Sequence, residues 1–489
     1  MELGRIFCRK SFTKILLTSL FVVSQIDYLQ ASEINELSQK SVTNSAIKNY
    51  PKILSAYEKV SAAEGSVLAS KGFFDIKLKQ NYSDKTRGFY DGKTYDVSLE
   101  KELGVLGAKA YGGYRKSFGD FADYEGGLRT NSGGEYRAGA KFSLLRNSGI
   151  DDNRLAVILA NLGLQESKIQ LENIKMEIER DATKTYWKWV VGGKIYQVYE
   201  GLYQLSLVRQ NQLEQRLKKG DVAQIIVHEN RKNILRRKSA LAKARQDFEN
   251  SAIYLSLYWR NDRGLPVTPQ KNQLPNIEFY LQEIADHQAK SDLELALSNR
   301  PEIRILNVKK EEQLSELKYA KNLFKPELDV DVGSSKDLGN GPNSRSQANN
   351  YANLNFSIPL QQREAKGKFA ESESRLKSIR YEQQITEEKI GAEIEQIKIR
   401  IKNIIEMHDN LVEEAKLADL LEASEREKFS HGASNFFLVN LREQDTAASK
   451  AAVFEMSEKY QEALADYKLA VFRIEKEASP SDRKTLAHE

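Results

Sequence analysis

Two stretches of this 489-residue chain, residues 52–265 and 360–479, contain no proline. Proline ends or kinks a helix because it lacks a backbone N–H and its ring clashes with the preceding turn. Each stretch therefore has room for helices much longer than the usual three to four turns. Three of the nine prolines cluster within residues 263–276, which predicts a linker between two halves of the chain.

Apolar residues keep heptad spacing within both stretches. The first contains two series set about 200° apart around a helix: Leu155, Leu162, Ile169 and Met176, and Val157, Leu164, Leu171 and Ile178. The second contains Ile390, Ile397, Ile404, Leu411 and Ala418, with Ile394 and Ile401 as companions. Opposed stripes indicate a helix with neighbours on both sides, as in a ring of helices. A two-stranded coiled coil is the simpler alternative.

Short segments with period-two alternation interrupt the helical pattern. Such alternation predicts strands with one apolar and one polar face. Six segments show it: residues 76–82, 95–100, 108–115, 136–144, 327–332 and 352–358. An ordinary soluble sandwich gives the same alternation, but no segment of this chain supplies a second sheet. A barrel in an outer membrane, with lipid outside and water inside, is the better interpretation.

The N-terminus has the pattern of a secretory signal peptide. Four basic residues within 5–14 precede the apolar run 15–26, and Ala31 offers a small residue for cleavage. The only cysteine, Cys8, lies in this segment, so we expect a mature chain without a disulfide or a lipidated cysteine. No other segment has 18 consecutive apolar residues, so entry into a membrane would have to be as strands.

Matching segments occur in the same order in the two halves. "NYPKIL" (49–54) matches "NRPEIR" (299–304), "FSLLR" (142–146) matches "FSIPL" (356–360), and "RLKKGDVAQIIV" (216–227) matches "KFSHGASNFFLV" (428–439). The order in each half is helix, strands, very long helix, glycine-centred turn and long helix. We interpret this as a duplication. The offset falls from 250 to 214, so the first half carries 36 additional residues between its first and last strands.

The predicted organisation follows from these signals. It consists of a signal peptide (1–31), an N-terminal helix (32–72), strands (73–145), a helical hairpin (146–262), a linker (263–298), the first helix of the second repeat (299–325), strands (326–360), a second helical hairpin (361–477) and a flexible tail (478–489).

The order of elements, the duplicated N-x-P, "FKPELDV", "FSIPL" and the "KFSHGAS" turn resemble the TolC family of outer-membrane efflux proteins. The resemblance covers almost all of the mature chain. It implies a mainly α fold with membrane β: a homotrimer whose long antiparallel coiled-coil helices form an α-barrel that continues into a shared transmembrane β-barrel.

The same resemblance implies the function. The chain would be the passive exit duct of a tripartite system, for small-molecule efflux or type I protein secretion. Its partners would be further copies of itself, outer-membrane lipid, a periplasmic adaptor and, through the adaptor, an inner-membrane transporter. The barrel would lie in the outer membrane of a Gram-negative bacterium and the helices in the periplasm.

This sequence departs from the family pattern in two respects. The family usually contributes four strands per chain, whereas six are predicted here, and the additional pair either widens the barrel or forms an extracellular hairpin. Where the best-known member narrows its tunnel with aspartates, this chain has Leu438 and Leu441, with Ile226 and Glu229 in the first repeat. Glu229 and Glu443 are candidate substitutes, although exposed coiled-coil glutamates are commoner. On the strands, the candidate pore-lining residues are Asp329, Asp331, Asn353 and Asn355.

Gly220 and Gly432 lie where each predicted hairpin reverses, and glycine accepts the left-handed conformation that ends helices. The residues around them are Asp221, Val222, Ile225 and Ile226, and Ala433, Ser434, Phe436 and Phe437. Their apolar side chains either pack the two helices of a tip together or form a docking surface for the adaptor.

Little in the sequence indicates an enzyme. The five histidines have no metal-ligand spacing, no nucleotide-binding or hydrolase motif occurs, and a net charge of +5 gives no nucleic-acid signal. Trp187 and Trp189 are expected to pack in a core rather than to form a ligand cage. We therefore predict no cofactor and no metal. The alternative function is a periplasmic or surface coiled-coil scaffold without a pore.

Overall fold

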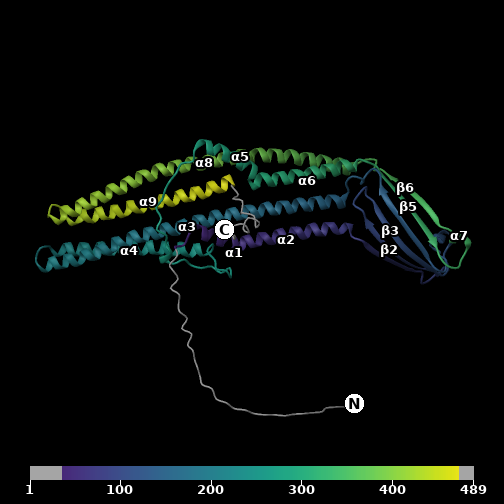
Figure 1. Ribbon diagram of the computed structural model, residues 1–489, viewed down its shortest axis with the longest axis horizontal. Helices are drawn as coiled ribbons and strands as arrows, with labels where there is room; N and C mark the ends of the chain where they lie inside the picture. Colours follow the sequence, from purple (N-terminus) through teal and green to yellow (C-terminus); the bar gives the residue numbers. More distant parts are fainter. Residues whose placement is uncertain (1–35, 473–489) are drawn as a thin grey trace, which may run out of the picture.

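The structure, a computed structural model, describes residues 36–472, which form an elongated molecule (Figure 1). A sheet lies at one end, two helical hairpins end at the other, and the helices run side by side between them. The predicted signal peptide with Cys8 and the predicted tail from residue 478 lie outside the described residues.

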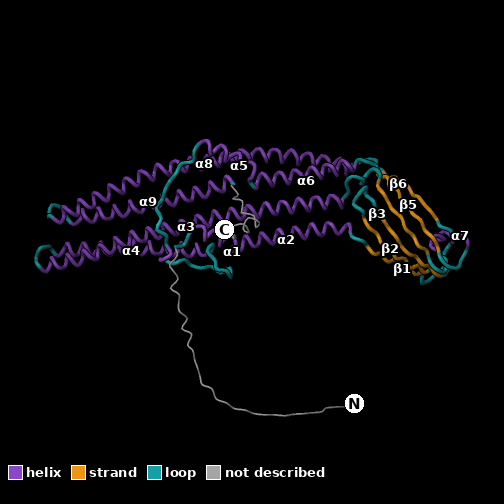
Figure 2. Tube along the Cα trace, in the orientation of Figure 1, coloured by secondary structure: helices purple, strands orange, loops and turns teal. Residues whose placement is uncertain are grey.

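Long helices form most of the molecule, as Figure 2 shows. They are α1 (Gln39–Asn49), α2 (Pro51–Lys71), α3 (Asp152–Lys218), α4 (Gln224–Ser256), α5 (Asp286–Asn299), α6 (Pro301–Leu323), the short α7 (Asn343–Ser346), α8 (Arg363–Ser430) and α9 (Phe436–Val471). α3 and α8 contain 67 and 68 residues, which corresponds to about 100 Å each. Within residues 36–472, no helix combines the length and the apolar character needed to cross a membrane.

Each N-x-P motif separates a short helix from a longer one. Pro51 and Pro301 occupy the first positions of α2 and α6, and the preceding Tyr50 and Arg300 have extended backbones. Proline excludes its preceding residue from the helical region and is well suited to the first helical turn. For this reason the helix predicted over 32–72 is divided into α1 and α2. The predicted linker 263–298 likewise contains most of α5, which the sequence analysis did not anticipate.

The six predicted strands are confirmed and form one antiparallel sheet in the order β1-β2-β3-β4-β5-β6. They are β1 (Lys77–Asp84), β2 (Lys93–Glu102), β3 (Lys109–Phe118), β4 (Glu135–Ser143), β5 (Glu327–Asp337) and β6 (Asn349–Ser357). The additional residues of the first half form β2 and β3, which lie between β1 and β4. The additional pair is therefore part of the sheet and not a separate hairpin. β1 and β6 are its two edges.

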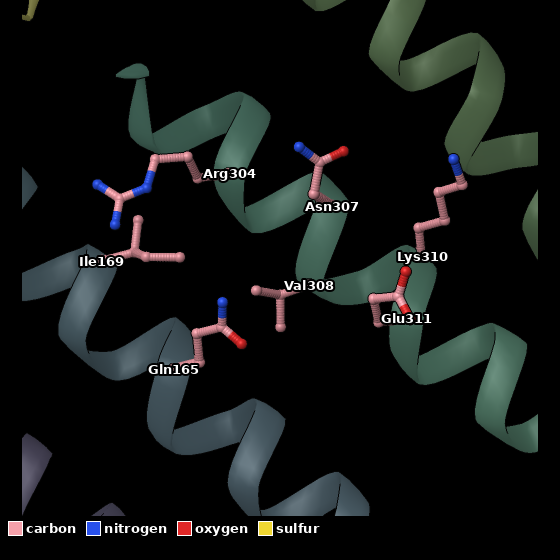
Figure 3. A pocket seen from close by; sticks show the side chains of 7 residues that line it. All are labelled: Gln165, Ile169, Arg304, Asn307, Val308, Lys310 and Glu311. Atoms are coloured by element: carbon pink, nitrogen blue, oxygen red, sulfur yellow. The ribbon is translucent and has the colours of Figure 1, made fainter. Parts of the chain in front are cut away.

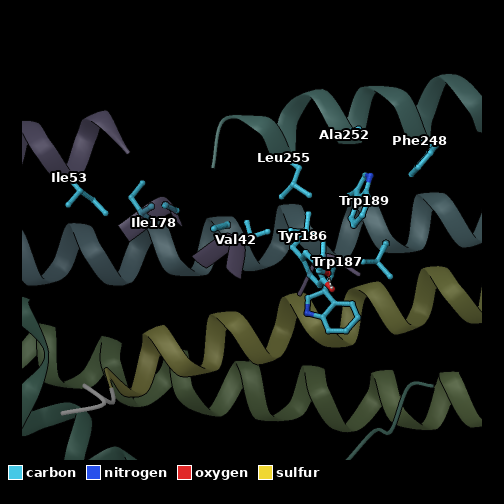
Figure 4. Close-up of a cluster of buried hydrophobic side chains, with 13 residues drawn as sticks. Val42, Ile53, Ile178, Tyr186, Trp187, Trp189, Phe248, Ala252 and Leu255 are labelled. Carbon is cyan, nitrogen blue, oxygen red and sulfur yellow. Dashed lines mark hydrogen bonds between the residues drawn. The ribbon is translucent and has the colours of Figure 1, made fainter. Parts of the chain in front are cut away.

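Two hydrophobic cores join the helices near the middle of the molecule. The first contains Trp187 and Trp189 of α3, packed against residues of α1 and α4 (Figure 4). Trp189 is fully buried and Trp187 donates a hydrogen bond from Nε1 to Oε1 of Gln39, so both tryptophans are packing residues as predicted. A Cβ at Gly193 would lie 2.5 Å from the side chain of Leu274, so the glycine allows close packing where the linker crosses α3.

The second core confirms the heptad pattern of the second half. Ile390, Ile394, Ile397, Ile401 and Ile404 of α8 are all buried, in a cluster that also contains α9 residues. Burying aliphatic side chains of this size contributes about 1.5–3 kcal/mol each. The heptad series therefore joins α8 to α9 at the end of the hairpin farthest from its turn.

Candidate functional site

The two faces of the sheet differ in chemistry. The strand register places one apolar set on a single face, as in the paired residues Leu78↔Leu99, Val97↔Tyr114, Phe142↔Val330 and Val330↔Leu354. Large members of this set remain exposed, Phe356 by 64% and Leu354 by 68%. Exposed apolar area of this extent on a soluble protein marks an interaction surface. These exposed apolar side chains on one side of the sheet form its apolar face.

The opposite, polar face carries ion pairs between neighbouring strands. Glu100 binds both Lys79 and Lys109, Arg115 binds Glu135, and Lys141 lies 2.9 Å from Asp329. These pairs balance most of the charge along the face. A face with paired charges and no apolar core above it is suited to contact with water.

Several contacts on the polar face pass over an intervening strand. Arg137 of β4 binds Asp96 of β2 across β3, where Gly113 leaves room for the guanidinium. The hydroxyl of Tyr111 on β3 lies 2.7 Å from Asp331 on β5 and 2.6 Å from the hydroxyl of Tyr351 on β6.

Glycines make the tyrosine contacts possible. A Cβ at Gly139 would lie 2.5 Å from the Tyr111 hydroxyl, and one at Gly333 would lie equally close to that of Tyr351. The two rings thus lie over glycine backbones. Contacts across intervening strands are favoured on the inner side of a curved sheet, because curvature brings the ends of its side chains together. The polar face is therefore suited to be the concave one.

The strands have the length of membrane-crossing strands. They contain 8 to 11 residues each, and a tilted transmembrane strand needs about 9–11. All four strand residues predicted to line a pore lie on the polar face: Asp329, Asp331, Asn353 and Asn355. Glu229 is partly exposed on α4, next to Lys232 at 3.5 Å.

Glu443 lies instead in a buried ion cluster between the two hairpins. The residue is only 1% exposed. It accepts hydrogen bonds from Arg209 of α3 at 2.7 Å and from Arg237 of α4 at 2.8 Å, and Arg426 of α8 lies 3.1 Å away. Within this protomer the carboxylate is therefore the shared counter-ion of three helices and does not face a lumen.

The charges around Glu443 fix its ionisation. Burial by itself raises the pKa of a carboxyl group, but the hydrogen bonds and charges of Arg209 and Arg237 outweigh it, so the pKa of Glu443 lies below its usual range. Neither arginine was predicted from the sequence as a functional residue. For Arg209, the position in the sequence is a recognisable signal. It falls between the buried Leu202 and Leu213 at heptad spacing, where an apolar residue is expected.

The tip glycines adopt the predicted left-handed conformation. Gly220 and Gly432 both have φ 78°. After each, a backbone N–H bonds five residues back, from Asp221 to Arg216 and from Ala433 to Lys428, both at 2.9 Å. These are Schellman motifs, which require a residue at positive φ.

The apolar tip residues differ in burial. Phe436 is buried and lies against Phe429 and Arg209, so it packs the tip together. Ile225 and Phe437 are 68% and 65% exposed. The remaining candidates are partly buried (Val222, Ile226, Ser434) or exposed (Asp221, Ala433).

A polar groove of about 270 Å³ marks the joint between the two halves of the chain (Figure 3). Gln165 and Ile169 of α3 face Val308 and Arg304 of α6 across it. Arg304 is ion-paired with Glu172 of α3. The groove thus lies beside a partly exposed ion pair between α3 and α6.

Comparisons with known proteins give a structural match and no sequence match. No protein-family model matches the chain, and no curated protein matches its sequence. The Campylobacter jejuni CmeC outer membrane channel is 13% identical and aligns over 98% of each chain with a TM-score of 0.60. VceC from Vibrio cholerae, an outer membrane protein, is 12% identical over 88% of this chain and 95% of its own, with a TM-score of 0.61.

The open state of the Neisseria gonorrhoeae MtrE outer membrane channel gives a TM-score of 0.60 at 12% identity, over 88% of each chain. Likeness at such low identity shows the fold. The chain therefore has the fold of outer-membrane channel proteins, and the resemblance predicted from the sequence is confirmed at that level. Two of the three matched proteins, CmeC and MtrE, are outer membrane channels.

Proposed function

We propose that this chain is the exit duct of an export system in the outer membrane, conducting substrates passively from an inner-membrane pump. The observation that carries the proposal is the pair of contrasting faces on a sheet of membrane-length strands. Lipid would cover the exposed apolar face, and water would fill the space beside the ion-paired polar face. The helices, about 100 Å long, would continue the duct across the periplasm.

The open edges of the sheet support assembly from several copies. β1 leads away from the helices and β6 leads back to them, so β6 of one copy and β1 of the next would pair antiparallel, as every other pair in the sheet does. Exposed edge strands pair readily with other chains, and closure removes them. Three copies, as in the resembling family, would close one barrel with every apolar face outward.

The tips are the proposed contact with the periplasmic adaptor. Ile225 and Phe437 expose large apolar side chains beside the two turns, so packing within the tips does not explain why these residues are apolar. Glu229 is a remaining candidate for a charge near the inner end of the duct. The substrate would be a small molecule or a secreted protein, because both export routes use the same architecture.

Fractionation and native mass test the proposed function directly. We expect the protein in the Sarkosyl-insoluble membrane fraction, with the mass of three copies and conductance in planar bilayers. The scaffold without a pore predicts a soluble dimer that conducts no ions. That result would exclude the duct.

Gly432→Val is expected to abolish export while the trimer still inserts. A β-branched residue is strained at positive φ, so the variant displaces the turn and the neighbouring Phe437. Gly432→Ala should be less harmful. Gly201→Val is the matched control, because Gly201 lies inside α3 with open space around its Cβ position.

The measurement combines export with cross-linking to the adaptor from Asp221→Cys, an exposed position on the other tip turn. Cys8 is the only native cysteine, and it lies in the predicted signal peptide. Loss of the cross-link together with export supports docking at the tips. A Gly432→Val protein that exports and cross-links normally would remove the tips from the mechanism.

A further inference from the structure

We infer that the hairpin formed by β2 and β3 widens the exit pore to 18 strands, six from each of three copies. This inference rests on the proposed function. It concerns the 36 additional residues of the first half, which the second half lacks between β5 and β6. The pore would then admit large hydrated solutes that a 12-stranded barrel excludes.

The hairpin is fully part of the sheet. β2 pairs with β1 along the whole of β1, from Lys77↔Glu100 to Asp84↔Lys93. β3 pairs with β4 from Lys109↔Lys141 to Arg115↔Glu135. A hairpin that projected beyond the membrane would leave β1 and β4 paired with each other, but here they are separated by two strands of ten residues.

Both faces of the hairpin continue those of its neighbours. Val97 and Tyr114 extend the apolar face. On the polar face, Asp96 binds Arg137, Glu100 binds Lys79 and Arg115 binds Glu135, so each of these charges has its partner on a flanking strand. The hairpin is therefore linked by ion pairs to both strands between which it is inserted.

The turn of the hairpin nearest the helices is apolar and exposed. Leu103, Val105 and Leu106 all belong to it and are about half exposed or more. A turn in water would normally carry polar residues. Its composition suits the boundary between lipid and water, which places the whole hairpin at the depth of the other strands.

The number of strands sets the width of the pore. With about 4.8 Å between strands and a tilt of about 40°, 18 strands give a backbone radius of about 18 Å, against about 12 Å for 12 strands. Barrels of 16–18 strands enclose an aqueous channel. Most charges of this lining are ion-paired, as Asp329 is with Lys141 and Glu327 with Arg146, which favours size over charge as the basis of selection.

The test measures which probes reach the polar face from outside the cell. Asn353→Cys places a thiol on the polar face of β6, and Leu354→Cys places one on the apolar face. Intact cells expressing either full-length variant are treated with maleimide-linked polyethylene glycols of increasing size. A shortened chain serves for comparison. It carries Asn353→Cys, and its residues 85–134 are replaced by a copy of residues 338–348, which connect β5 to β6.

We expect Asn353→Cys in the full chain to accept a probe of about 20 Å diameter, which leaves too little room inside a 12-stranded backbone about 24 Å across. The shortened chain should lose labelling by that probe and keep labelling by small ones. Exclusion of the 20 Å probe from the full-length trimer overturns the inference, even if the shortened chain fails to assemble.

The two proposals fail in different ways. A trimer that conducts ions but excludes the large probe contradicts only the widening. Equal labelling of Asn353→Cys and Leu354→Cys by water-soluble maleimides shows that neither face is shielded by lipid, and it contradicts the proposed duct itself.

Discussion

Glu443→Gln is expected to lower the free energy of unfolding by about 3–5 kcal/mol, because it leaves buried arginines without their counter-ion. Arg209 and Arg237 are both less than 10% exposed, so water cannot replace the lost charge. The amide keeps the size of the carboxylate, which isolates the effect of charge. Thermal unfolding of the purified protein, followed by circular dichroism, measures the loss.

Asp445→Asn is the matched control, since Asp445 is an exposed acid on the same helix. Arg237→Gln, alone and combined with Glu443→Gln, completes a double-mutant cycle. We expect the double variant to be more stable than the sum of the single effects predicts, by about 0.5–3 kcal/mol. Additive effects, or a Glu443→Gln protein as stable as the control, would show that the cluster does not hold the hairpins together.

The cluster also predicts a dependence on pH. The pKa of Glu443 is lowered in the folded protein, so its stabilising contribution is fully present above the unfolded value of about 4.3. The contribution is lost as the pH falls through the folded pKa below that value. Wild type and Glu443→Gln should therefore differ in melting temperature at pH 7 and converge under strong acid.

Phe356→Arg is expected to reduce stable insertion into the outer membrane. Phe356 is largely exposed on the apolar face, so the substitution removes little packing within the protomer. Arginine facing lipid costs about 2–4 kcal/mol at mid-membrane and less towards the interface, where Phe356 lies at the end of β6 nearest the helices, but every copy in the assembly would carry it. The amount of trimer in the outer-membrane fraction measures the effect.

The adjacent Asn355→Arg is the control, because Asn355 lies on the polar face opposite Asp329. We expect that variant to insert normally and to change conductance. Asp331→Arg is a poorer control, because Asp331 accepts a hydrogen bond from Tyr111. Equal loss of insertion for Phe356→Arg and Asn355→Arg would contradict the assignment of the two faces.

Local patterns in the sequence were sufficient to predict the six strands and the two long helical hairpins. Alternation in residues 327–332 predicted which side chains share a face, since successive side chains of a strand point in opposite directions. Gly220 and Gly432 predicted the turns, because positive φ is costly for other residues. The N-x-P motifs were recognised as a repeated sequence, although the short helix before each proline was not predicted.

Contacts between distant parts of the chain were decided only by the tertiary structure. Arg209 and Glu443 are separated by 234 residues, and Tyr111 and Tyr351 by 240. No periodicity within one segment specifies which residue of another segment it will face. Glu443 was therefore predicted as an exposed or pore-lining acid, whereas packing of the two hairpins buries it among arginines.

For the additional strands β2 and β3, the sequence determined their existence and the tertiary structure their position. The sequence by itself determined that the first half has two more amphipathic strands, because their alternation and the change in offset are local facts. Insertion between β1 and β4 or projection beyond the sheet satisfied that pattern equally well. The tertiary structure shows insertion, because β2 and β3 pair with β1 and β4 and form ion pairs with β4. Only folding brings together the partners that satisfy these backbone hydrogen bonds and charges.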